Sequence, residues 1–464
     1  MNKTNCKFLI LLVVLSFALL LVSCNNHNED GGNATDSNTT QDDNSGNTDS
    51  TKEQRKKYKV IFDYNDGSGL SEIAYIPEGD FISLYAPYPI NDNREVTGWS
   101  AVPNGADYEV GVNADVTLYA KWTTYEAVIY NNNIPDTITD RFAILEPASD
   151  PSALFGKTLR IGPNVRNISF VSDGTVYDSF SILIANRSED INITFDNFAY
   201  ISNKGSCGIK GENTAIPYTV NLKINGATTI DCSKYIDGNL DRGVDCISVP
   251  NLNISGQGEI TLIAADGFDG ESKPQAQNGC DGDPGGNGQN GGNGIVANSV
   301  KVTHTTVRIY AGDGGKGGNG GSGNNVSGVE DVFDIIGGNS GKHKNGGRGG
   351  NGGNGGSAIC TESFSGDLAA LYFYAGNGGA GGKGGACGGS SYTYAGDGGN
   401  GGNGGNGGNV FDVYLFDPNI SGCSITVEVG VGGEPGAGGS SQNSSKDGFG
   451  GVPGTEGQVN IPTN

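Results

Sequence analysis

The segment IVANSVKVTHTTVRIYAGDGGKGGNGG, residues 295–321, joins two patterns that predict two different backbone structures. Up to Tyr310, apolar and polar residues alternate, which predicts β-strands. From Asp313 onward the chain repeats a Gly-Gly-X triplet and offers no apolar side chain to a core. We therefore expect a repeating β fold whose strands are interrupted by glycine-rich excursions.

The strand part of this segment recurs on either side of it. Residues 247–267 read ISVPNLNISGQGEITLIAADG, and residues 359–378 read ICTESFSGDLAALYFYAGNG. Each copy opens on Ile and carries an apolar residue five positions later: Leu252, Val300 or Phe364. One such unit cannot bury its apolar face alone, whereas stacked units share a continuous core. The repeat predicts a mainly β fold containing a parallel β-solenoid, and a β-helix rather than a sandwich.

The glycine tracts, such as GGNGGNGGNGGN at residues 398–409, keep a period of three. Polyproline-II-like helices have three residues per turn and no internal hydrogen bonds. With Gly on two of three faces, neighbouring helices can approach and bond to one another, so we expect packed polyglycine-II-like insertions. A disordered spacer is the alternative. The third face points outward, and the residues we expect to contact a ligand are Asn400, Asn403, Asn406, Tyr392 and Tyr394.

Three repeat strands end in an Asp-Gly pair, at Asp266, Asp313 and Asp397. If these residues recur at one corner of the stack, their carboxylates supply the oxygen ligands that Ca²⁺ requires. The competing interpretation is that Asp-Gly only forms the turn. The strand-and-Asp-Gly pattern also resembles, faintly, that of carbohydrate-binding β-helix lipoproteins of bacteria, whose coils hold Ca²⁺ on acidic residues.

Residues 58–123 carry a different signature. A strand with Val60-Ile61-Phe62 opens it, Gly98-Trp99 stands at its centre, and TLYAKW closes it at residues 117–122. In order and spacing these residues resemble the Listeria–Bacteroides repeat, also called the internalin B-repeat. The resemblance implies a small β-grasp-like module of bacterial surface proteins that acts as a spacer or contact unit without catalysis.

The N-terminal residues indicate export. After Lys3 and Lys7, residues 8–22 are almost wholly apolar but shorter than the ~20 residues of a membrane-spanning helix. The run ends in LVSC at residues 21–24, which resembles the bacterial lipobox, in which the Cys is lipidated; here that residue is Cys24. Residues 25–57 lack large apolar side chains, so we expect a disordered tether.

Charge and cysteine content limit the classes of function. The net charge of -23 excludes a nucleic-acid-binding surface of the usual basic kind. The cysteines after Cys24 show no CxxC spacing, and the chain has 3 His, so a structural zinc site is unsupported. We expect most of these cysteines to be small buried hydrophobes.

These observations predict five segments: a lipoprotein signal peptide (1–23), the lipidated Cys and tether (24–57), the repeat domain (58–123), β-solenoid coils (124–265) and glycine-rich repeats of the solenoid (266–464). The function they favour is a non-catalytic adhesin or ligand-binding lipoprotein at the outer membrane or cell surface. Its partners would be the membrane, through the lipid, and an extracellular glycan or host protein. The alternative is a Ca²⁺-dependent polysaccharide lyase or hydrolase of the β-helix type, with Asp178, Asp190, Asp196 and Arg187 as candidate groups.

The lipobox assignment predicts the effect of Cys24→Ser. The variant should lose all incorporation of radiolabelled palmitate, because the thiol that carries the lipid is gone, and the protein should be released or remain unprocessed. Labelling equal to that of the wild type would contradict the assignment.

Overall fold

The computed structural model describes residues 55–459 except 88, 90–93, 125, 132, 148–149, 235–241, 278–279, 325–343, 389–395, 414–418 and 442–443. The residues from Lys57 onward form one compact unit. The expected signal peptide, Cys24 and nearly all of the expected tether therefore lie outside the described residues. Within the described part the chain is almost entirely β, and no helix there is long and apolar enough to span a membrane.

The first folded element is a four-stranded sheet with the order β2-β1-β4-β3. Its strands are β1 (Lys57–Asp63), β2 (Ser71–Pro77), β3 (Arg94–Ser100) and β4 (Val116–Thr124), and a 3₁₀ turn, η1 (Ile82–Leu84), follows β2. β1 pairs in parallel with β4, and the outer pairs are antiparallel. Trp99 lies in the core with its ring 4.8 Å from that of Phe62. This mixed sheet with its parallel central pair agrees with the β-grasp-like module that the resemblance implies.

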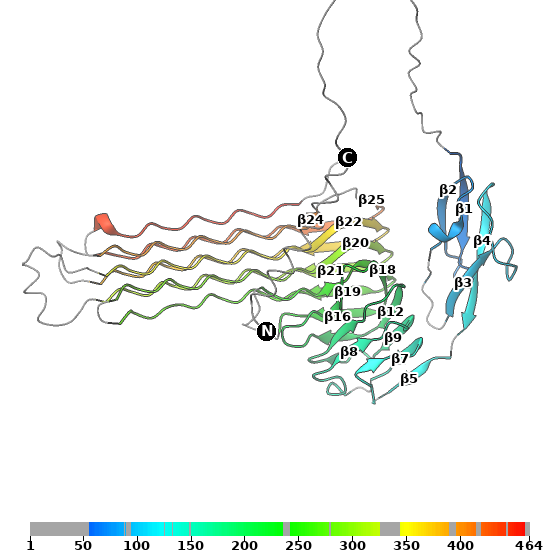
Figure 1. Ribbon diagram of the computed structural model, residues 1–464, viewed down its shortest axis with the longest axis horizontal. Helices are drawn as coiled ribbons and strands as arrows, with labels where there is room; N and C mark the ends of the chain where they lie inside the picture. Colours follow the sequence, from blue (N-terminus) through cyan, green and yellow to red (C-terminus); the bar gives the residue numbers. More distant parts are fainter. Residues whose placement is uncertain are drawn as a thin grey trace, which may run out of the picture. The chain divides into compact units, whose positions relative to one another are not determined.

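The rest of the strands form a parallel β-helix with three columns, visible as the stacked arrows in Figure 1. The first column consists of β6 (Thr137–Ile138), β8 (Thr158–Ile161), β11 (Ser181–Ile184), β14 (Ile209–Gly211), β17 (Ile247–Ser248), the first halves of β20 (Ile295–Thr303) and β22 (Ile359–Asp367), and β24 (Phe411–Val413). The second consists of β5 (Val128–Tyr130), β7 (Phe142–Leu145), β9 (Asn167–Val171), β12 (Ile191–Asp196), β15 (Thr219–Asn225), β18 (Asn251–Gly256), the second halves of β20 and β22, and β25 (Asn419–Ser421). The third consists of β10 (Val176–Tyr177), β13 (Ala199–Ile201), β16 (Ala227–Asp231), β19 (Glu259–Ile263), β21 (Thr306–Tyr310), β23 (Ala370–Tyr374) and β26 (Ser424–Glu428).

The register of these columns follows the sequence repeat. Ile247, Ile295 and Ile359 are consecutive partners in the first column. Leu252, Val300 and Phe364 are consecutive partners in the second. The parallel β-solenoid predicted from the recurring segment is therefore confirmed, and its strands continue between the glycine tracts as far as β26.

From β12 onward, the corner between the second and third columns turns within one or two residues. Five of these corners contain a residue with positive φ: Asn197 (50°), Gly226 (72°), His304 (54°), Leu368 (48°) and Gly422 (62°); the longer corner between β9 and β10 holds Gly174 (97°). The left-handed conformation favours Gly and Asn and is costly for other residues. His304 and Leu368 adopt it because the strands on either side are fixed by their ladders.

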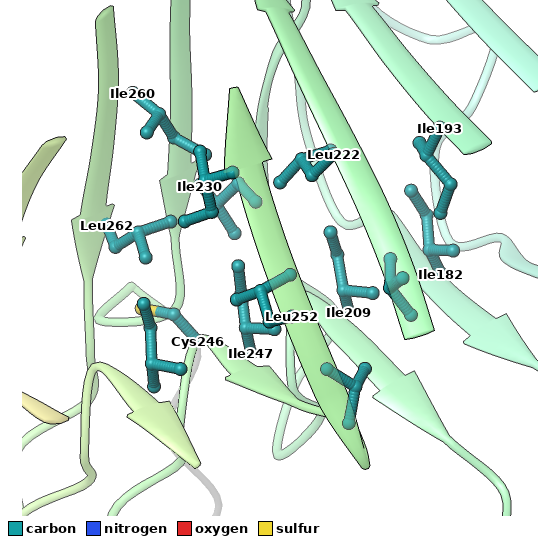
Figure 2. Packing of buried hydrophobic residues seen from close by; sticks show 14 of the residues in the cluster. Ile182, Ile193, Ile209, Leu222, Ile230, Cys246, Ile247, Leu252, Ile260 and Leu262 are labelled. Atoms are coloured by element: carbon teal, nitrogen blue, oxygen red, sulfur yellow. The ribbon is translucent and has the colours of Figure 1, made fainter. Parts of the chain in front are cut away.

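Apolar side chains from the three columns fill the interior of the β-helix. Figure 2 shows Leu222 from the second column beside Ile230 from the third, and Ile193 from the second column beside Ile182 from the first. Cys246 lies in the same core, and Cys232 is also buried. The other five cysteines after Cys24 are half-buried or, at Cys280, exposed, so the expectation that most of them are buried is wrong. Burying each Leu or Ile contributes about 1.5–3 kcal/mol, so the coils are stabilised mainly by this core.

Glycine-rich arms extend from one side of the last coils (Figure 1). Outgoing arms leave the third column at residues 266–277, 312–324, 376–388 and 430–441. Returning arms lead back at residues 281–293, 344–357 and 396–409, and a last one covers residues 446–458. The outgoing arms form one layer and the returning arms a second layer, which together we call the slab.

Backbone hydrogen bonds hold the slab together in both directions. In the triplet Gly401-Gly402-Asn403, the Gly401 N–H donates to the Phe449 carbonyl of the next returning arm (2.8 Å). The Gly402 N–H donates to the Gly382 carbonyl of an outgoing arm, also at 2.8 Å. The same two bonds recur along the inner arms, which establishes the polyglycine-II-like arrangement and excludes a disordered spacer for the described triplets.

Both glycines of each inner triplet stand where a side chain has no room. A Cβ on Gly401 would lie 2.0 Å from the carbonyl oxygen of Gly436 in the opposite layer. A Cβ on Gly402 would lie 1.8 Å from that of Gly350 in the preceding returning arm. The obstacles are backbone atoms of hydrogen-bonded arms, so they cannot rotate away. At Gly450, in the last arm, the nearest atom is 3.7 Å from such a Cβ.

This contrast predicts different effects for two chemically identical substitutions. Gly402→Ala should destabilise the slab by about 1–3 kcal/mol or more, because the arms must separate to admit the methyl group. Gly450→Ala should be neutral, or stabilising by up to about 1 kcal/mol through the unfolded chain. Thermal melts and amide hydrogen exchange of the two variants test this. Equal protection of the arm amides in both variants would contradict the packing described.

Candidate functional site

The outward residue of each triplet also takes part in the slab. The backbone N–H of Asn403 donates to the side-chain Oδ1 of Asn351 (3.0 Å), and the N–H of Val452 donates to Oδ1 of Asn403 (2.9 Å). Three residues further along the same two arms, Oδ1 of Asn354 accepts from the N–H of Asn406 at 2.8 Å. An Asn at the outward position therefore satisfies the one N–H of the following arm that the backbone leaves open.

Six of these residues form a regular array on the returning layer. They make two columns of three, with each column crossing three successive arms: Asn287, Asn351 and Asn403, then Asn290, Asn354 and Asn406. All are exposed except Asn351, which is half-buried. Along an arm the array repeats every three residues, or about 9 Å. Between arms the repeat is one coil of the β-helix, or about 4.8 Å.

Each carboxamide in the array is oriented by its oxygen and keeps its nitrogen available. None of the six Nδ2 atoms donates to another described group. A buried Asn ladder in the β-helix behaves differently: Asn192 Nδ2 donates to Asn167 Oδ1 at 2.7 Å and Asn192 Oδ1 accepts from Asn221 Nδ2 at 3.0 Å, so both ends of the Asn192 amide are used inside the protein. The array on the returning layer, which we call the Asn face, thus presents oriented N–H donors to the exterior. Asn400 borders it, with Oδ1 accepting from Phe449 N–H at 2.9 Å.

The structure corrects the expected column of aspartates. Asp266 and Asp313 do follow one another in the outgoing layer, where Asp266 Oδ1 accepts the Asp313 N–H at 2.8 Å. Asp397 lies instead in a returning arm, where its N–H donates to Asn345 Oδ1. The prediction of three stacked aspartates is therefore wrong, because the Asp-Gly at 397 opens a returning arm rather than closing a third-column strand.

Two other sequence-based expectations have no structural counterpart that can be described. Tyr392 and Tyr394 lie outside the described residues. Among the residues described, no cluster of three or more His, Cys, Asp or Glu side chains could hold a metal ion. Oδ1 of Asp266 instead accepts the backbone N–H of Asp313. This role differs from both roles considered from the sequence, which were metal ligand and turn former.

The outer face of the third column carries an aromatic ladder that sequence reasoning did not identify. The rings of Tyr310 and Tyr374 stack at 4.7 Å, and the Arg308 guanidinium lies 4.0 Å from the ring centre of Tyr372. Arg308 also pairs with Glu259 at 3.0 Å. These ring faces contact one another across successive coils, so the ladder stabilises the coils and leaves mainly ring edges for a ligand.

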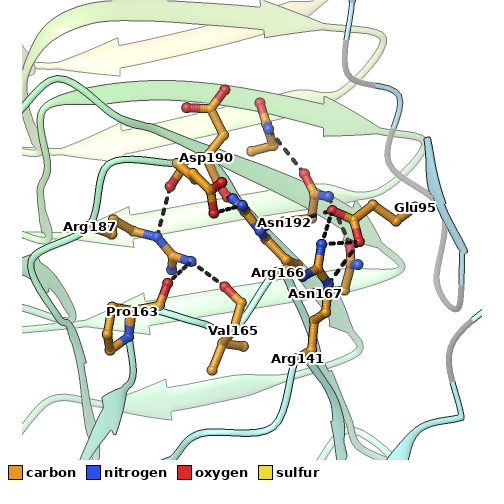
Figure 3. Close-up of polar contacts among 11 residues, drawn as sticks. Glu95, Arg141, Pro163, Val165, Arg166, Asn167, Arg187, Asp190 and Asn192 are labelled. Atoms are coloured by element: carbon orange, nitrogen blue, oxygen red, sulfur yellow. Dashed lines mark hydrogen bonds and ion pairs between the residues drawn. The ribbon is translucent and has the colours of Figure 1, made fainter. Parts of the chain in front are cut away.

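The groups considered for a lyase are dispersed and occupied. Asp190 precedes β12 and Asp196 is its last residue, so six steps along the strand place them about 20 Å apart, beyond the range of a carboxylate pair. Arg187 is buried and donates to the carbonyl oxygens of Pro163 (3.1 Å), Glu189 (2.8 Å) and Val165, as Figure 3 shows. Burial, with the Arg166 charge beside it, lowers the pKa of Arg187 to about 10, so it stays protonated at neutral pH.

Comparison with known proteins adds no identification: no protein family, no curated protein and no solved structure matches this chain. The Asn face is the candidate site on geometry alone, because it is exposed, regular and rigidly held.

The stacked carboxylates of the outgoing layer generate a pH-dependent prediction. Burial and the charge of Asp313 raise the pKa of Asp266 above its ordinary value of 3.8. Ionisation of Asp266 therefore lowers the stability of the folded state. The loss is complete at pH values above the raised pKa, and it is absent at pH values below about 3.8, where the carboxyl group is protonated in both the folded and the unfolded chain. Asp266→Asn keeps the oxygen that caps Asp313 and should stabilise the folded state at pH 7 by less than about 1 kcal/mol, because water still reaches part of this carboxylate and screens its charge. The gain should disappear in acid.

Melting curves of the wild type and Asp266→Asn at pH 7 and pH 3, with and without Ca²⁺, provide the measurement. A gain that persists at pH 3 would show that charge is not its source. Stabilisation of the wild type alone by millimolar Ca²⁺ would instead support the sequence-based calcium site at Asp266 and Asp313.

Proposed function

We propose that this protein is a surface-anchored, non-catalytic binding protein whose Asn face holds a glycan. The observation that carries the proposal is the array of six Asn amides, each with Oδ1 bonded to a neighbouring arm and Nδ2 available outward. Hydroxyl and ring oxygens of a polysaccharide are acceptors for such donors. Because the amides are already oriented, little conformational entropy is lost when a ligand binds.

Charge supports a neutral ligand. The whole chain has a net charge of -23, yet the charged outward residues of the returning arms balance: Asp281, Arg348, Asp397 and Lys446, the last two 4.0 Å apart. A polyanion would be repelled by the rest of the protein, and a polycation would find no concentrated negative charge on this face. An uncharged polysaccharide fits both conditions.

The proposed location rests on the sequence. A lipid on Cys24, a polar tether over residues 25–57 and the β-grasp-like module would together hold the slab away from the membrane that carries the anchor. Such an arrangement suits a protein that contacts glycans outside the cell. The dispersed positions of Asp190, Asp196 and Arg187 give no support to the alternative of a lyase or hydrolase.

Substitution by Asp tests the Asn face without disturbing the slab. Asn354→Asp/Asn403→Asp/Asn406→Asp keeps Oδ1 for the arm contacts, as Asp281 does naturally toward the Asn345 N–H (2.8 Å), but removes the outward N–H donors. On a glycan array with the full-length chain, this variant should lose at least tenfold in affinity for any neutral glycan bound by the wild type.

The matched control lies in the other layer. Asn319 and Asn377 cap Lys383 and Val431 in the same way from the outgoing side. Asn319→Asp/Asn377→Asp introduces the same kind of charge and should keep wild-type binding. Equal losses in both variants would trace the effect to net charge, and absence of wild-type binding to every neutral glycan would refute the proposed function.

A further inference from the structure

The last returning arm, at the edge of the Asn face, carries exposed apolar side chains. In the last returning arm, the outward positions that follow the columns of Asn400 and Asn403 are occupied by Phe449 and Val452. Their side chains are 78% and 64% exposed. No arm follows in the described chain, so an Asn cap is not needed there. The missing need for a cap explains why Asn is not required at these positions. It does not explain why a phenyl ring stands there, because exposing a phenyl ring to water is unfavourable without a contact.

The last returning arm is not suited to pair through its backbone with a further arm, including an arm from a second copy of the chain. In inner arms the first residue of each triplet donates its N–H to the arm that follows. In the last returning arm two of these positions hold Pro453, which has no N–H, and Glu456, which adds charge; Pro435 has the equivalent place in the last outgoing arm. Proline and charge at an edge prevent strand-like addition. A stacked arm is therefore not what covers Phe449.

We infer that Phe449 and Val452 form an apolar rail that packs against the C–H faces of sugar rings, and that the ligand is a straight, neutral, β-linked polysaccharide lying along the arms. This inference rests on the proposed function of the Asn face. A pyranose ring with equatorial hydroxyls has polar edges and two apolar C–H faces. The Asn amides would bond the edges while the phenyl ring covers a face, and the two kinds of contact lie on neighbouring arms.

The geometry of the arms selects the shape of the chain. The donors Asn400, Asn403 and Asn406 repeat in a straight line, once per triplet or about every 9 Å. That interval is close to the length of two extended sugar residues. A β-linked chain that extends straight can run along this row of donors, whereas an α-linked chain curves away from it.

Binding of four soluble oligosaccharides to the full-length chain tests the inference by calorimetry. Cellohexaose and chitohexaose are straight and neutral, maltohexaose is α-linked, and oligogalacturonate is anionic. We expect binding of one or both straight neutral chains, and at least tenfold weaker binding of the other two. Phe449→Ala should lose about fivefold to tenfold in affinity for the preferred chain, as expected for one aromatic contact, and Phe449→Tyr should retain it.

Val431→Ala is the matched control. Val431 is also an exposed apolar residue of the last coil (62%), but it stands in the outgoing layer, away from the Asn face, and its loss should leave affinity unchanged. Unchanged affinity of Phe449→Ala, or equal binding of maltohexaose, would overturn the rail while leaving the Asn face in place. If the wild type bound none of the four probes but did bind another neutral glycan on the array, the ligand class would be wrong and the proposed function would stand.

Discussion

The structure of the glycine-rich half depends on one steric fact: two residues of every inner triplet have no Cβ. Carbonyl oxygens of neighbouring arms occupy the space that a methyl group at Gly401 or Gly402 would need. Because the arms can come this close, all three N–H groups of a triplet such as Gly401-Gly402-Asn403 find acceptors, two on other backbones and one on an Asn side chain. A layer with no apolar interior is thereby ordered by hydrogen bonds that each contribute only about 0.5–1.5 kcal/mol net. The β-helix beside it is stabilised in the opposite way, by a core of buried Ile, Leu, Val and Phe.

The two halves support each other. The coils set the height at which each arm leaves and returns, since residues at the end of β21 and β23 are already paired in register before the arms begin. An isolated Gly-Gly-X peptide would lose more conformational entropy on ordering than a peptide of the same length with ordinary glycine content, because Gly is the most flexible residue. Anchoring both ends of the arms in a preformed stack removes much of that cost. Glycine-rich segments are thus ordered here because a hydrophobic core positions them.

Much of this fold could be predicted from the sequence, because its repeats are local and explicit. The spacing from Ile295 to Val300 and its copies indicated the strand register, and the period of three indicated the arms. What could not be predicted was which arm lies beside which. Asn351 caps Asn403, 52 residues further on, whereas Asn287 caps Asn351 across 64 residues. These unequal separations arise from excursions of different length, so Asp397 was assigned to the wrong layer and the oriented amides were not foreseen. The outward position of Phe449 in the last returning arm was likewise not predicted.

The packing of the slab fixes which position of each triplet can hold a side chain. Each arm alternates three environments in strict order, one facing the opposite layer, one facing the preceding arm and one facing solvent. An insertion of a single residue would move Asn403 or its equivalents into the space reserved for Gly, and every residue beyond it in that arm would be displaced in the same sense. Arms can therefore lengthen or shorten during evolution only by whole triplets, and compatibly in the arms above and below. The distance to which the slab extends from the coils therefore changes in steps of one triplet and not by single residues.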